Sequence, residues 1–215
     1  MQAKPIDRRE FLTTTLGGLA LGAGMVRAQQ PDPSGLPRRP LGATGEKICI
    51  IGLGGWDIGN VKDHGEAVAI MHEAIDGGLT FFDNCWDYHD GHSEEIMGKA
   101  LADGGRRDKV FLMTKVCARD YEGAKKHLDD SLRRLRTDRI DLWQFHGIQW
   151  DDDPQLIFDE KAGAVRAALE ARVAGKVRFI GFTGHKDPRH HLAMLQRDFA
   201  FDAVQMPLNV LDATY

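Results

Sequence analysis

The chain has 215 residues, of which 42% are hydrophobic and 28% are charged, and its formal net charge is -4. This balance is typical of a globular domain, and basic residues interspersed with acidic ones offer no phosphate-binding stripe, so nucleic acid is excluded as the expected partner. The three cysteines, Cys49, Cys85 and Cys117, show no paired metal-binding spacing. We therefore expect buried free thiols, with a disulfide between Cys85 and Cys117 as the alternative.

Residues 1–28 resemble a twin-arginine signal peptide. Arg8 and Arg9 stand before a glycine-rich apolar run from Leu16 to Val26, and small residues at Val26 and Ala28 offer a cleavage site. The run is shorter than the about 20 apolar residues that a membrane-spanning helix needs. We expect export to the periplasm by the twin-arginine machinery, with a disordered tail as the alternative. Residues 29–38 are expected to form an extended linker.

After the linker, strands and helices alternate. A short hairpin is expected at residues 41–48, and the expected strands are short apolar runs at residues 49–55, 79–83, 110–115, 140–146, 177–182 and 201–205. One expected helix runs from Ser93, its N-terminal cap, to about Leu101. The other expected helices are marked by apolar side chains at helical spacing: Val68, Met71 and Ile75; Leu128, Leu132 and Leu135; Val165, Leu169 and Val173; and Leu192 and Leu195. Strict alternation predicts an α/β fold with parallel strands and right-handed crossovers.

Three polar residues share one position in this pattern. Asp83, Lys115 and His146 each end an expected strand, at intervals of 32 and 31 residues, and Tyr88 follows Asp83 on the adjoining loop. Parallel α/β folds place their active sites at the carboxyl ends of the strands, so we expect these side chains to meet there. A polar residue that merely caps a strand end explains one of these positions well and all three poorly.

The chain from about residue 39 resembles the aldo-keto reductases. The shared motifs include Pro40-Leu41-Gly42, Gly52-Leu53-Gly54-Gly55-Trp56, Phe82-Asp83 with Tyr88, Ser93-Glu94-Glu95 with Gly98-Lys99-Ala100-Leu101, Thr114-Lys115, Ile140-Asp141-Leu142, His146 and Gly175-Lys176-Val177-Arg178. The resemblance implies a (β/α)8 TIM barrel that interconverts a carbonyl and an alcohol with NADPH or NADH as the cofactor. We expect about six barrel strands within residues 39–215, strands seven and eight missing, and a chain that is inactive alone.

The resemblance also assigns roles to single residues. It implies a catalytic tetrad of Asp83, Tyr88, Lys115 and His146, with Asp83 also near the cofactor. Thr183 and Gln205 match positions that hold the nicotinamide carboxamide. The sequence departs from the common pattern at two positions: Gly184 stands where asparagine is common, and Leu208 stands where many relatives stack an aromatic ring on the cofactor.

The expected chemistry is proton transfer to a carbonyl oxygen. Tyrosine, with an ordinary pKa of about 10, is a weak acid until a neighbouring cation stabilises its phenolate. Lys115 is the expected cation, Asp83 holds it, and His146 orients a small carbonyl or sugar-like substrate. Trp56 is expected to line the substrate pocket, with plain core packing as the alternative.

Two other functions remain open from the sequence. A metal-dependent barrel enzyme could use His89, His92 and Glu94, together with the later histidines His185, His190 and His191. A non-catalytic relative could bind a nucleotide and a partner. The motif from Gly181 to Pro188 resembles a branch whose longer members carry an iron-sulfur tail, but no cluster is expected from this chain. We expect no metal ligands among the site residues, and the oligomeric state is left open.

Overall fold

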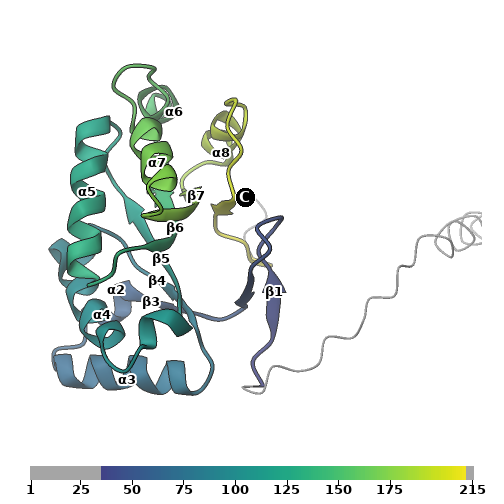
Figure 1. Cartoon of the computed structure of the whole chain (residues 1–215). Helices are drawn as coiled ribbons and strands as arrows, with labels where there is room; N and C mark the ends of the chain where they lie inside the picture. Colours follow the sequence, from purple (N-terminus) through teal and green to yellow (C-terminus); the bar gives the residue numbers. More distant parts are fainter. Residues whose placement is uncertain (1–34, 212–215) are drawn as a thin grey trace, which may run out of the picture. The chain divides into compact units, whose positions relative to one another are not determined.

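A six-stranded parallel sheet forms the centre of the computed structural model, which describes residues 35–211. Its strands pair in chain order: β3 (Gly52–Gly54), β4 (Phe81–Asp83), β5 (Phe111–Val116), β6 (Ile140–Phe145), β7 (Val177–Thr183) and β8 (Ala203–Gln205). The sheet curls, with helices along its outer face (Figure 1). Six parallel strands confirm the expected part of a (β/α)8 barrel. The expected signal peptide and residues 29–34 of the expected linker lie outside the described residues.

The helices occupy the connections between strands. They are α2 (Gly55–Gly59), α3 (His64–Asp76), α4 (His92–Ala102), α5 (Tyr121–Arg134), α6 (Asp153–Ile157), α7 (Ala164–Val173) and α8 (Pro188–Leu195), with short 3-10 helices η1 (Tyr88–Gly91) and η2 (Arg106–Lys109). Three begin at an aspartate whose carboxylate accepts backbone N–H groups of the first turn: Asp63, Asp120 and Asp187. Within residues 35–211, no helix is both long and apolar enough to cross a membrane.

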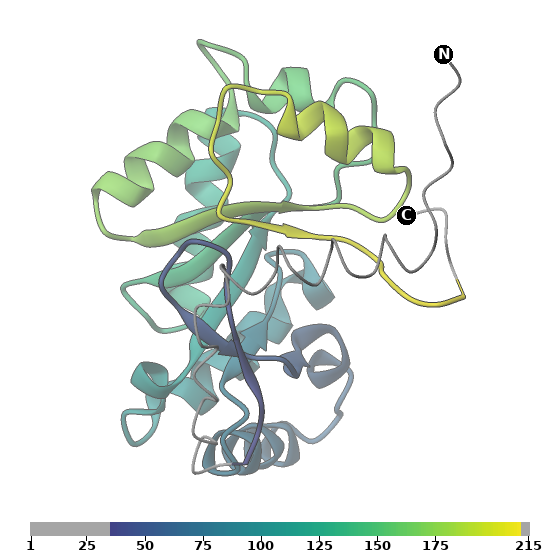
Figure 2. The same cartoon turned by 90° about the vertical axis from the view of Figure 1, so that its right-hand side faces the viewer.

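The expected hairpin forms, and it changes where the first barrel strand begins. β1 (Arg38–Pro40) pairs antiparallel with β2 (Lys47–Cys49), which takes Cys49 out of the barrel strand expected at residues 49–55. Ile50 and Ile51 are 55% and 49% exposed, and β3 starts only at Gly52. The hairpin, in purple in Figure 2, is tied to β7 by an ion pair between Glu46 and Arg178.

The core lies between the sheet and the helices in two groups. One group packs β4 and β5 against α3 and α4 around Phe82, Met71 and Leu112. The other packs β6 and β7 against α5 and α7 around Trp143 and Phe182. Both groups hold the strands as a rigid frame, so the positions of the strand ends are fixed.

Two helices bury a different face from the one expected. Helix α7 packs through four alanines, Ala164, Ala167, Ala168 and Ala171, whereas Val173 is 91% exposed. Small side chains let α7 approach α5 closely, which the larger apolar residues of the expected face do not allow. Helix α8 likewise buries Met194 and leaves Leu192 and Leu195 more than half exposed. The helices themselves are where the sequence predicted them.

Candidate active site

The polar strand-end residues meet at the carboxyl edge of the sheet. Asp83 is the last residue of β4, and His146 directly follows β6. Lys115 is the next-to-last residue of β5 rather than the last, because that strand continues through Val116. The parallel pairing places all three side chains at the same end of the sheet.

Lys115 is the centre of this group. Its side chain is almost fully buried, and Nζ contacts Asp83 Oδ1, donates to the backbone oxygen of Asn84 at 2.8 Å and donates to the Tyr88 hydroxyl at 3.2 Å. Burial lowers the pKa of Lys115, but the negative charges of Asp83, Cys85 and Tyr88 and the hydrogen bond with Asp83 together outweigh it, so the pKa is raised overall. Lys115 is therefore a cation held in place beside the Tyr88 hydroxyl.

Tyr88 opens η1 and lies half-buried between Lys115 and two aromatic rings. Its ring meets those of Trp56 and His146 edge to face, at 5.3 and 5.9 Å between centroids. Burial raises the pKa of Tyr88, and the lowering by Lys115 does not fully offset that effect. Tyr88 therefore keeps its proton in the neutral range, with the Lys115 ammonium beside its hydroxyl.

The turn after Tyr88 has an uncommon backbone. His89 and Asp90 have φ values of 52° and 55°, in the left-handed region that non-glycine residues rarely adopt. His89 compensates with a 2.8 Å hydrogen bond between Nε2 and the backbone oxygen of Trp56. Gly59 makes room for it, because a Cβ there would lie 2.2 Å from the His89 ring. These contacts fix the turn that presents Tyr88.

A pocket opens over the tetrad, and its lining includes the residues expected at the cofactor. The wall comprises Tyr88, Lys115, His146, Thr183, Gly184, His185, Gln205, Met206 and Pro207. Gln205 Nε2 donates to Asp83 Oδ2 at 3.2 Å, and Thr183 Oγ1 accepts from the Gly147 N–H at 2.9 Å. Both expected cofactor residues therefore lie beside Asp83 and His146.

The structure gives a reason for one departure from the family pattern. A Cβ on Gly184 would lie 2.7 Å from the backbone oxygen of Ile148 and 2.8 Å from the His191 ring. Asparagine at this position therefore requires the loop after β6 to move. Leu208, at the other departure, is 85% exposed.

Trp56, expected to line the substrate pocket, lies on α2 and is not part of the wall of that pocket. The side chain is 53% exposed, and its ring contacts Tyr88 and His89. Plain core packing does not describe such a position. Trp56 instead forms an apolar surface next to Tyr88.

The histidines and the glutamate weighed as metal ligands do not gather. Glu94 is buried and accepts from Thr114 Oγ1 at 2.7 Å and from Arg134 at 3.3 Å, while burial raises its pKa. His92 faces His64 and Glu95 instead.

Ser93, which was expected to cap α4, does not do so. Its hydroxyl donates to the Gly55 oxygen at 2.6 Å, and Gly91 takes the cap position.

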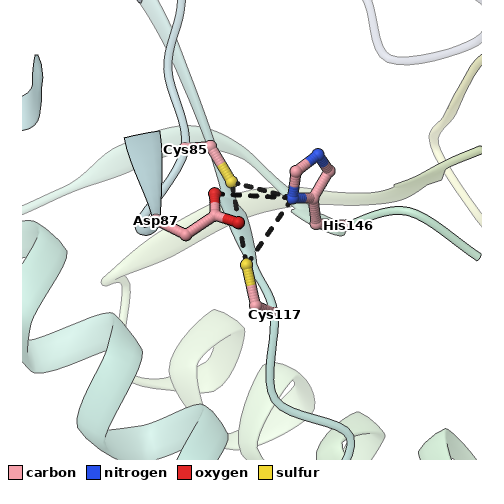
Figure 3. A group of neighbouring side chains, drawn as sticks. All are labelled: Cys85, Asp87, Cys117 and His146. Atoms are coloured by element: carbon pink, nitrogen blue, oxygen red, sulfur yellow. Dashed lines mark hydrogen bonds and ion pairs between the residues drawn. The ribbon is translucent and has the colours of Figure 1, made fainter. Parts of the chain in front are cut away.

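A different group of metal-binding side chains comes together in the described part of the chain. Cys85, Asp87, Cys117 and His146 place one donor atom each within 4.8 Å of one another (Figure 3). The sequence contained a signal for it: Cys85 and Cys117 each stand two residues after a tetrad member and keep the same 32-residue interval. The three cysteines are unbonded: Cys49 and Cys85 are buried, Cys117 is half-buried rather than buried as expected, and the Cys85 and Cys117 sulfurs are 3.9 Å apart.

The two neighbouring thiols differ in acidity. A hydrogen bond from Cys85 lowers the pKa of Cys117 to about 6, whereas burial raises that of Cys85 well above its usual range. Burial also raises the pKa of Asp87, but hydrogen bonds with the thiols and the charge of His146 lower it overall. When the two thiols lose their first proton, the negative charge therefore lies mainly on Cys117.

Fold and site together define a barrel-type α/β sheet with a group of polar side chains at the carboxyl ends of its parallel strands, the end where such folds carry their active sites. Residues 50–214 match the aldo/keto reductase family, and the chain belongs to this family. It is 38% identical to the uncharacterized oxidoreductase YrpG of Bacillus subtilis over 161 residues, which are 66% of this chain and 47% of that protein. The chain spans about half the length of the relatives it matches.

Two solved structures share the fold. The holo form of aldo-keto reductase AKR11C1 from Bacillus halodurans superposes with a TM-score of 0.70 at 29% identity, over 80% of this chain and 58% of that one. An aldo-keto reductase from Klebsiella pneumoniae in complex with NADPH gives a TM-score of 0.60 at 31% identity, over 70% and 50% of the two chains. These likenesses agree with the family resemblance expected from the motifs.

Proposed function

We propose that the protein uses NADPH or NADH to interconvert an aldehyde or ketone and an alcohol, with Tyr88 as the general acid. One observation carries the proposal: Lys115 Nζ joins the carboxylate of Asp83 to the hydroxyl of Tyr88 at the base of a pocket. The oxidoreductase relatives support the same reaction class.

The proton step follows from the surroundings of Tyr88. Its raised pKa keeps the hydroxyl protonated, so it can donate to the oxygen of a carbonyl as negative charge develops there. The phenolate left behind lies 3.2 Å from the Lys115 ammonium. Asp83 holds that ammonium in place and helps to keep it charged, so the phenolate forms beside a positive charge that stabilises it.

His146 lines the same pocket as Tyr88. Its ring meets Tyr88 edge to face, so a carbonyl oxygen within reach of the Tyr88 hydroxyl is also near the imidazole. A ring N–H directed at that oxygen orients the carbonyl and stabilises its developing charge. Trp56 supplies an apolar surface for a small carbonyl or sugar-like substrate.

The pocket has the groups that a nicotinamide carboxamide requires. The Thr183 hydroxyl and the Gln205 amide line the pocket beside Asp83, and Gln205 is held by a 3.1 Å hydrogen bond from Gln144. Gln144 keeps a buried amide oxygen without a hydrogen-bond partner. A bound NADPH or NADH supplies the hydride for the reduction.

The test is Tyr88→Phe. Tyr121→Phe is the matched control, because the Tyr121 hydroxyl donates a hydrogen bond to Glu170 on α7 instead. In a protein that carries all eight barrel strands, we expect Tyr88→Phe to lose about 10²- to 10⁴-fold in the rate of aldehyde reduction, the usual contribution of a positioned general acid. NADPH affinity, measured by fluorescence titration, should stay within about twofold, since the hydroxyl serves the substrate. Near-normal turnover would remove Tyr88 from the acid role. Tight NADPH binding by the wild type without reduction of any carbonyl in a panel would favour the non-catalytic alternative.

We also propose that the protein is exported by the twin-arginine pathway to the periplasm. The proposal rests on Arg8 and Arg9 ahead of the apolar run. That pathway carries folded proteins, which suits an enzyme that acquires its cofactor before export.

A further inference from the structure

We propose that Cys85, Asp87, Cys117 and His146 form a zinc site behind the catalytic pocket. Two sulfurs, an imidazole nitrogen and a carboxylate are a complete donor set for Zn²⁺. The mixture of soft and hard donors favours Zn²⁺ over Ca²⁺ or Mg²⁺, which prefer oxygen ligands only.

The donor atoms already have nearly the spacing that the ion requires. With Zn–S bonds of about 2.3 Å and Zn–N or Zn–O bonds of about 2.0–2.1 Å, tetrahedral donors lie roughly 3.3–3.8 Å apart. The His146 Nδ1 atom lies 3.1 Å from Cys85 Sγ, 3.5 Å from Cys117 Sγ and 3.6 Å from Asp87 Oδ1. The two sulfurs are 3.9 Å apart. These four distances therefore need shifts of only a few tenths of an ångström, and the Asp87 carboxylate, which lies within 4.8 Å of both sulfurs, closes the set. Binding releases the thiol protons to solvent.

The ligands are presented by rigid parts of the fold. Cys85 follows β4, where its N–H donates to the side chain of buried Asn84 at 2.8 Å. Cys117 and His146 follow the adjacent strands β5 and β6, and Arg119 joins the two loops by donating to the Cys117 and His146 backbone oxygens at 3.2 and 2.8 Å. A site built on three neighbouring strand ends is ordered before the ion arrives.

A disulfide between the two cysteines explains less of this arrangement. It would use two of the four side chains and leave His146 Nδ1 and Asp87 with no function in the cluster. The His146 Nδ1 atom points into the cluster, while Nε2 points away from it (Figure 3). All four donors facing one point is the arrangement expected of a metal site.

Zinc at Nδ1 has a consequence for the reaction, and this part rests on the proposed function. A metal on Nδ1 leaves the ring proton on Nε2, the nitrogen directed away from the cluster. Nε2 is then always a hydrogen-bond donor. The ion would make His146 a fixed donor to the carbonyl oxygen without itself touching the substrate.

The experiment measures metal content first and needs no activity. The protein is purified without chelator, and its zinc is measured by mass spectrometry; we expect about one Zn²⁺ per chain and a much lower content in Cys117→Ser and Cys85→Ser. Cys49→Ser is the matched control, because Cys49 is also a buried free thiol but lies in the β1–β2 hairpin. Asp87→Asn, at a half-exposed position, should fold normally and bind zinc at least about 10-fold more weakly in competition with a chelating dye.

Cobalt gives a second readout of the same site. Co²⁺ added to the metal-free protein should show thiolate-to-cobalt charge-transfer absorption, and Cys117→Ser should reduce it. Protein without stoichiometric zinc and without that absorption would overturn the proposal, as would a mass two hydrogens lower that reports a Cys85–Cys117 disulfide. Tyr88→Phe should keep full zinc content while losing reduction, so failure of the zinc site and failure of the proposed reaction are told apart.

Discussion

Replacing Asp153 with asparagine should destabilise the protein strongly, because this buried carboxylate supports the loops that carry Cys117 and His146. Asp153 is 3% exposed; its oxygens accept from Arg119 Nε at 2.7 Å and from the N–H groups of Gln149 and Trp150 at 2.8 and 2.9 Å. Asparagine keeps one acceptor oxygen but loses the charge opposite Arg119.

The magnitude follows from the burial of the pair. Removing one partner of a buried ion pair costs about 3–5 kcal/mol, because the remaining charge is left without compensation. The Arg119 side chain is 18% exposed, so water can reach it in part. We therefore expect the free energy of unfolding to fall by about 3 kcal/mol, the lower end of that range. Asp152→Asn is the matched control: Asp152 is exposed and caps no backbone N–H of α6, and surface changes of this kind shift stability by about 0.5 kcal/mol or less.

Urea unfolding of both variants at pH 7 measures the difference, and acid titration tests its cause. Burial raises the pKa of Asp153, but the hydrogen bond and charge of Arg119 and the hydrogen bonds from the Gln149 and Trp150 N–H groups together lower it by more, so the folded-state pKa lies below the unfolded one. The stabilisation is therefore present above the unfolded pKa of about 3.9 and is lost as the pH falls through the folded value. A free-energy loss under about 1 kcal/mol for Asp153→Asn, or one that persists unchanged under strong acid, would refute this account.

Two further predictions concern packing and export. Gly98→Ala should lower the free energy of unfolding, measured in urea, by about 1–3 kcal/mol, because the added Cβ would lie 2.1 Å from the Arg134 backbone oxygen. Gly54→Ala is the control and should change little, because nothing lies within 4 Å of its added carbon. Equal effects of the two changes would contradict the close approach of α4 and α5. Lysine at both Arg8 and Arg9 should retain the protein in the cytoplasm, since the pathway reads the guanidinium pair; unchanged periplasmic recovery in cell fractions would argue against twin-arginine export.

The positions of the strands and of the tetrad could be read from the sequence because they depend on local signals. Apolar runs with polar ends mark the strands, and the near-constant interval between Asp83, Lys115 and His146 reflects one βα unit after another. Tyr88 follows from the same motif, although the left-handed turn that presents it has no signal in the sequence.

The features that the sequence did not predict depend on how closely neighbouring elements approach one another. The alanine face of α7 could not be predicted from hydrophobic spacing, since what decides it is how closely α5 approaches. Ser93 fits the pattern of a helix cap, yet the nearby oxygen of Gly55 takes its hydrogen bond. Asp87 gave no signal, because its contact with the two thiols depends on how the loop after β4 folds back.

The three acceptors around Lys115 Nζ make this position selective for one cationic side chain. A carboxylate, a backbone oxygen and a phenol surround the nitrogen, one for each hydrogen of a tetrahedral ammonium. A planar guanidinium directs its hydrogens into a flat fork and is larger, so arginine cannot satisfy the same three partners in this buried space. In a redesign of this site, or in its evolution, the exchange of lysine for arginine therefore preserves the charge and loses the geometry.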